Sequence, residues 1–63
     1  MTFSLETQIA EVNLEIKKRR DVYAHLVNTG KMSVAAMDCK LAAMSAVRDT
    51  LAELQAQRAA ATH

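Results

Sequence analysis

The sequence lacks most of the residues that interrupt helices or crosslink small domains. It has no proline and a single glycine among 63 residues, so long helices can run without an internal break. A single cysteine excludes an internal disulfide, and large aromatic residues are limited to one phenylalanine and one tyrosine. Small domains with so little core material rely on metals, disulfides or oligomerisation, and we expect oligomerisation here.

Strong charge of one sign and long apolar runs are also missing. The net charge of +1 gives no bulk attraction to nucleic acid or acidic membranes. No stretch has the length and apolarity of a transmembrane helix, and the N-terminal "MTFSLETQIAEV" does not have the pattern of a signal peptide. The lone Cys39 fits a reducing compartment. We therefore expect a cytoplasmic protein with no membrane contact.

Apolar residues at helical spacing predict a first helix over about residues 4–29. Ser4 is a good N-cap, and a heptad seam with alternating spacings of four and three follows it. Arg19 is the one polar member of this seam. The apolar members are Leu5, Ile9, Val12, Ile16, Tyr23 and Leu26. Leu14, Val22 and Val27 lie off the seam and widen the apolar face beyond what one partner helix covers.

A short turn at about residues 30–32 separates this helix from a second one. Gly30 suits the position after a helix, where a left-handed backbone is needed. Ser33 is a good N-cap for the next helix, and Met32 and Met37 have the spacing of a hydrophobic staple. So short a link predicts an antiparallel hairpin.

The second helix is predicted over about residues 33–60. Its seam shifts sideways by one position where Val47 follows Met44 after only three residues. The seam residues are Val34, Met37, Leu41, Met44, Val47, Leu51 and Leu54. Alanines flank this seam, which either allows close approach of another helix or reflects only the high helix propensity of alanine. The predicted fold class is all-α: one helical-hairpin domain over residues 1–63 that dimerises into a four-helix bundle.

Catalytic and metal-binding patterns are not recognisable. His25, His63 and Cys39 have no metal-ligand spacing, and Cys39 has no base beside it in sequence. The carboxylates are distributed as on a solvated surface, and there is no glycine-rich phosphate loop. We expect no enzymatic activity, no catalytic residue, no cofactor and no metal.

The run "KKRR" at residues 17–20 is the strongest candidate for a functional motif. Consecutive helical residues lie about 100° apart, so these four side chains spread around the helix instead of forming one basic stripe. Glu15 and Asp21 lie at pairing distance within the same helix. A solvated, partly paired surface is therefore the favoured interpretation, and the alternative is contact of Lys17, Lys18 and Arg20 with nucleic-acid phosphates.

Two segments carry a resemblance to known proteins. "Y..LV..GKMS" begins at Tyr23 and "AM.AV.DTL" ends at Leu51. Together they resemble short helical-hairpin proteins of bacteria and phages whose activity is uncharacterised, which implies a phage or prophage accessory protein. The predicted architecture is also similar in design to the plasmid-encoded Rop RNA modulators, although no motif is shared.

These observations favour a small homo-oligomer, expected to be a dimer, that acts through protein–protein interaction as an adaptor, an inhibitor or a regulatory accessory. The first alternative is a Rop-like modulator that binds nucleic acid through the basic cluster. The second alternative is a structural component of a larger assembly.

Overall fold

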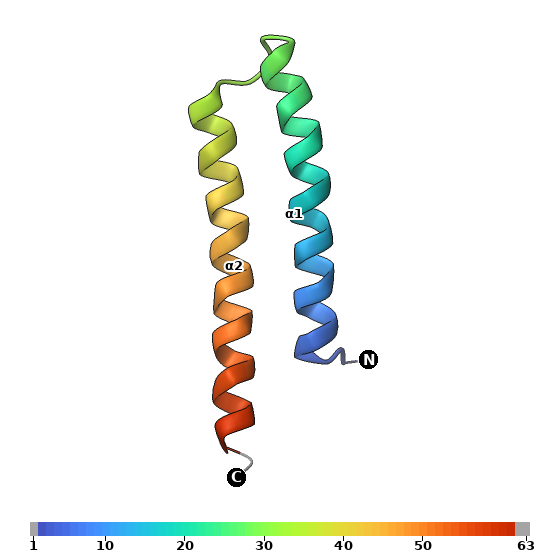
Figure 1. Ribbon diagram of the computed structural model, residues 1–63, viewed down its shortest axis with the longest axis vertical. Coiled ribbons are helices and arrows are strands. Elements are labelled where there is room, and N and C mark those ends of the chain that lie inside the picture. Colours follow the sequence, from blue (N-terminus) through green and yellow to red (C-terminus); the bar gives the residue numbers. More distant parts are fainter. Residues whose placement is uncertain (1, 62–63) are drawn as a thin grey trace.

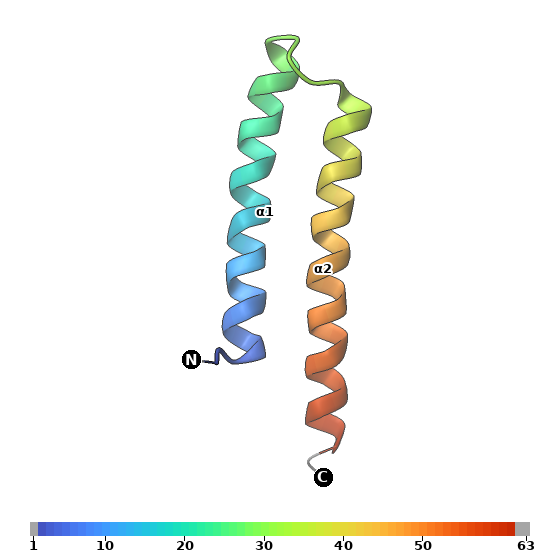
Figure 2. The same ribbon diagram turned by 180° about the vertical axis from the view of Figure 1, so that it is seen from behind.

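The protein is a pair of antiparallel helices joined by a short turn (Figure 1). The computed structural model describes residues 2–61, with α1 at Leu5–Asn28, α2 at Val34–Ala61 and no strand within that range. Each helix begins and ends within one residue of its predicted range. The helices lie side by side in both views, and α2 continues past the start of α1 (Figures 1 and 2). The result is an elongated molecule of 51 × 22 × 15 Å.

The start of α1 is fixed by its N-cap. The Ser4 Oγ accepts a hydrogen bond of 3.1 Å from the backbone N–H of Thr7, which satisfies one of the free donors of the first turn. The Gln8 side chain reaches back to donate to the Phe3 carbonyl at 3.0 Å. This second bond ties the segment before the helix to its second turn.

The end of α1 forms a Schellman motif around Gly30. The N–H of Lys31 donates to the Leu26 carbonyl at 2.8 Å, and the N–H of Gly30 donates to the Val27 carbonyl at 3.1 Å. Gly30 has a φ of 74°, which a residue with a Cβ adopts only at a cost. The chain therefore reverses direction at its only glycine.

The start of α2 repeats the capping seen in α1. The Ser33 Oγ accepts from the N–H of Ala36 at 3.0 Å, and the Ser33 carbonyl accepts from the N–H of Met37 at 3.1 Å. Met32 and Met37, on either side of this cap, are both partly buried. Two caps and one glycine thus fix the start of both helices, the end of α1 and the position of the turn.

Candidate interaction surface

The interface between the helices follows the heptad seam of α1. Ile16 is 5% exposed and is the one buried side chain among residues 2–61. The other seam positions of α1 are half-buried: Leu5, Ile9, Val12, Arg19, Tyr23 and Leu26. A core with one buried side chain is small even for a chain of this length.

On α2 the interface follows a different line from the predicted one. The half-buried residues Met37, Leu41, Met44, Arg48 and Leu51 keep an unbroken spacing of four and three. The predicted sideways step at Val47 does not occur, because a regular heptad line passes through Arg48 instead. Three predicted seam residues are consequently exposed within the hairpin: Val34 at 55%, Val47 at 47% and Leu54 at 37%.

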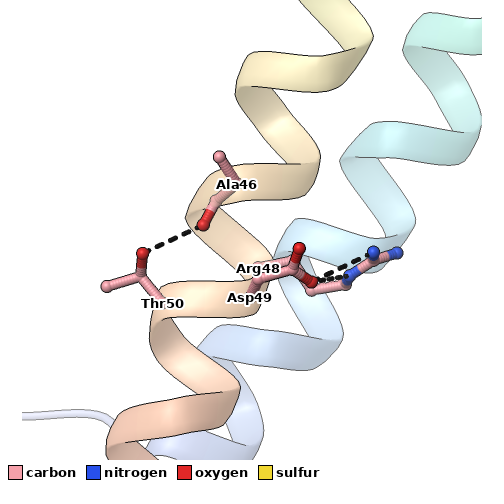
Figure 3. Close-up of polar contacts among 4 residues, drawn as sticks. All are labelled: Ala46, Arg48, Asp49 and Thr50. Atoms are coloured by element: carbon pink, nitrogen blue, oxygen red, sulfur yellow. Dashed lines mark hydrogen bonds and ion pairs between the residues drawn. The ribbon is translucent and has the colours of Figure 1, made fainter.

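Both seams thus contain one arginine, and each arginine is paired on its own helix. Arg19 Nε donates to Glu15 Oε1 at 2.8 Å, one turn away, so its charge is met without a partner on α2. This hydrogen bond lowers the pKa of Glu15 below its ordinary value. Arg48 contacts the neighbouring carboxylate of Asp49 through Nε and Nη2, at 3.3 and 3.2 Å (Figure 3). Both pairs are partly exposed, so each contributes little to stability.

An apolar groove opens between the first half of α1 and the second half of α2. Its volume is about 580 Å³. The lining residues are Phe3, Thr7, Gln8, Glu11, Val12, Val47 and Leu51. Phe3 is 61% exposed although it is the only phenylalanine of the chain. The groove is therefore a place where the hairpin leaves large apolar side chains in contact with water.

We call the side of the hairpin on which this groove opens the groove face. On each helix it continues beyond the groove, because residues seven apart share a position in a heptad. On α1 it comprises Gln8, Glu11, Glu15, Lys18 and Val22. On α2 it comprises Ala36, Lys40, Ala43, Val47, Thr50 and Leu54. Three exposed apolar residues, Val22, Val47 and Leu54, lie on this face. Leu14, seven residues after the groove-lining Thr7, adjoins this face on the side of α1 that is turned away from α2.

The basic cluster does not form one surface. Lys17, Lys18 and Arg20 are exposed. Lys17 and Arg20, three residues apart, lie on one side of α1, whereas Lys18 is turned by about 100° from Lys17. Arg19, the fourth cation, is held by Glu15. Lys18 alone lies on the groove face. Nucleic-acid contact by Lys17, Lys18 and Arg20 stays a prediction.

Other functional chemistry is sparse in the part of the chain that the structure describes. Cys39 is an exposed free thiol, and residues 2–61 contain no group of three or more histidine, cysteine or acidic side chains arranged to hold a metal. His63 lies outside these residues. Neither helix, over the same range, has the length and apolarity needed to cross a membrane.

Sequence reasoning missed two features of this surface. The groove includes Phe3, which precedes α1 and whose carbonyl accepts a hydrogen bond from the Gln8 side chain, and no spacing rule predicts that. The seam position of Arg48 was readable from the regular spacing of Met37, Leu41, Met44 and Leu51. In the sequence pattern its apolar neighbour, Val47, competes with it for that position.

Comparisons of the chain with protein-family models, curated proteins and solved structures give no match.

Proposed function

We propose that this chain is a small homo-oligomeric protein that acts through protein–protein contact, as an adaptor, an inhibitor or a regulatory accessory. The proposed oligomer is a dimer of hairpins that forms a four-helix bundle. The observation that carries this proposal is the amount of surface that one hairpin leaves in water.

The chain exposes 4853 Å², whereas a compact monomeric protein of 6.9 kDa exposes about 4,000 Å². The excess is roughly 850 Å², close to the 800 Å² or so that each partner contributes to a stable protein–protein interface. Covering one face of the hairpin with a second helical layer would thus give this chain the burial of an ordinary small domain. Two layers of helices around one core are also the common arrangement for a stable helical domain.

The distribution of apolar side chains supports the same proposal. Four large apolar residues on or beside one face of the hairpin are exposed: Phe3, Val22, Val47 and Leu54. Single exposed apolar residues are normal on any protein, but Phe3 and Val47 line one groove, and such clustering is typical of an interaction site.

Light scattering and thermal unfolding test the proposal together. We expect a solution mass of about twice 6.9 kDa at micromolar concentration. We also expect a melting temperature that rises with protein concentration, because association favours the folded state. A stable, folded monomer whose melting temperature does not depend on concentration would overturn the proposal.

The proposed dimer would act on a partner protein, which remains to be identified. An affinity pull-down from the native host, with the dimer as bait, addresses it directly.

A further inference from the structure

We infer that the groove face binds a second copy of this chain about a two-fold axis perpendicular to the helices, with the two turns at opposite ends of the dimer. This inference rests on the proposed self-association and specifies its face and its symmetry. In such a dimer, α1 lies antiparallel to α1 of the partner subunit, and α2 lies antiparallel to α2 of the partner subunit.

Side-chain size on α2 is self-complementary about position 45. A two-fold axis at that level pairs positions that are equally far from it along the chain. Val47 then lies opposite Ala43 of the partner subunit, and Leu54 lies opposite Ala36 of the partner subunit. Each exposed large side chain therefore meets a small one, which is the alternation that close packing between helices requires. Lys40 falls opposite Thr50 of the partner subunit and meets no like charge.

Charge on α1 is self-complementary about almost the same level. When the seam positions are counted outward from the turn, Ile16 falls level with Met44 and Val12 with Arg48, which places residue 15 of α1 level with residue 45 of α2. An axis within about half a residue of that level brings Glu11 opposite Lys18 of the partner subunit, and by symmetry Lys18 opposite Glu11 of the partner subunit. Val22 falls opposite Gln8 of the partner subunit. Glu15, nearest the axis, falls beside Glu15 of the partner subunit, and each of these carboxylates is paired with Arg19 of its own helix.

Side-chain size on α2 and charge on α1 thus each give a position for the two-fold axis. The register of the hairpin places these two positions at the same level along the helices. An axis parallel to the helices fits less well. It would place α1 of one subunit on α2 of the other and bring Lys18 beside Lys40 of the partner subunit, which is a repulsive contact. Complementary size, complementary charge and an excess area equal to one partner's share all favour the perpendicular axis.

Charge exchange is the sharpest test, because Glu11 and Lys18 are both exposed and their substitution leaves the seam intact. Sedimentation equilibrium would measure the dimer dissociation constant of the wild type, of Glu11→Lys, of Lys18→Glu and of the double variant. Two ion pairs become repulsive in each single variant, so we expect dimerisation to weaken about tenfold. The double variant restores both pairs in reversed polarity and should return to within about threefold of the wild type. Lys17→Glu, one residue outside the groove face, is the matched control and should behave as the wild type.

Substitutions of exposed apolar residues test the face itself. Val47 is 47% exposed on the groove face. Ala42 is also exposed, but its heptad position lies on the opposite side of α2, so it is the control. We expect Val47→Glu to weaken dimerisation by about a hundredfold or more, because it buries two charges in the interface. Ala42→Glu should leave it within about threefold. Circular dichroism of each variant shows whether the hairpin remains helical.

The possible results separate the inference from the proposed function. A wild-type dimer with no rescue in the double variant would overturn the perpendicular axis. A wild-type dimer that tolerates Val47→Glu but not Ala42→Glu would overturn the groove face, while homo-oligomerisation would stand. A wild type that stays monomeric would overturn the proposed function and this inference with it. If Val47→Glu unfolds the hairpin, the charge exchange still decides the inference.

Discussion

Replacing Ile16 by alanine tests whether α1 and α2 pack against each other around this side chain. Ile16 is 5% exposed and is the one buried side chain among residues 2–61. Its truncation removes three carbon atoms from the seam at the centre of α1. No other single truncation in the described residues should cost as much.

The expected loss follows from the size of the removed group and from its surroundings. Three buried carbons correspond to about 2.4 kcal/mol of apolar burial. The neighbouring seam residues are half-exposed and can close over the gap, so the additional cavity cost should be small. Alanine also has a better helix propensity than isoleucine, which returns about 0.4 kcal/mol. We therefore expect Ile16→Ala to lower the free energy of unfolding by about 2 kcal/mol, a large share of the stability of a small domain.

Urea unfolding followed by circular dichroism, with all variants at one protein concentration, measures this loss. Leu14→Ala is the control, since Leu14 is two residues away on the same helix but 45% exposed. It should change the free energy of unfolding by less than about 0.5 kcal/mol. Equal losses in the two variants would refute the reasoning, because Ile16 would then not lie in a packed interface.

Three further predictions concern the turn, the second cap and the ion pair. Gly30→Ala should cost about 1–2 kcal/mol of unfolding free energy, since its φ is 74° and a Cβ would meet nothing within 4 Å, so the cost is backbone strain alone. Gly30→Asn should cost less, and urea unfolding compares the two. Ser33→Ala should cost about 1 kcal/mol, measured in the same way, because it removes the acceptor for the N–H of Ala36. The pKa of Glu15 is lower in the folded state than in the unfolded state, so its ion pair stabilises the fold at neutral pH. This contribution is lost as the pH falls below the ordinary carboxylate pKa and through the lowered pKa of the folded state. Arg19→Gln should raise the pKa of Glu15 in an NMR titration and flatten that part of the stability profile, whereas an unchanged titration would show that the pair does not persist in solution.

The predictable part of this fold is local in sequence. Helix ends depend on Ser4, Gly30 and Ser33, and each acts through hydrogen bonds to residues three to five positions away. The α1 seam depends on spacing alone, because its apolar residues leave no competing line. Interactions between residues so close in sequence can be predicted from the residue types and their spacing.

The seam of α2 was harder to predict because two lines compete there. Val47 and Leu54 are the more apolar choices, whereas the regular line runs through Arg48. Apolar character favoured the first line, but the geometry of two helices in contact requires the second. Arg48 tolerates its seam position because its long side chain carries the charge out towards Asp49 (Figure 3). A seam is thus chosen by regular spacing across the whole helix and not by the best residue at each step.

The groove face was not predictable at all from one hairpin's pattern. The structure leaves Val47 and Leu54 outside the seam and places Phe3 in one groove with Val47. The widened apolar face of α1 already indicates, from the sequence, that one partner helix does not cover all the apolar residues of α1. Its location, however, depends on the relative rotation of the two helices, which neither sequence pattern fixes alone.

The most direct test of this account is the distance between the two turns of the assembled protein. A spin label on Lys31→Cys, in a Cys39→Ser background, would report it by pulsed electron paramagnetic resonance. Turns at opposite ends of a dimer centred on residue 45 place the labels on the order of 45 Å apart. We predict a single distance distribution near that value. A distance below about 20 Å would place both turns at one end and contradict the perpendicular axis, and the absence of any dipolar coupling at micromolar concentration would contradict self-association itself.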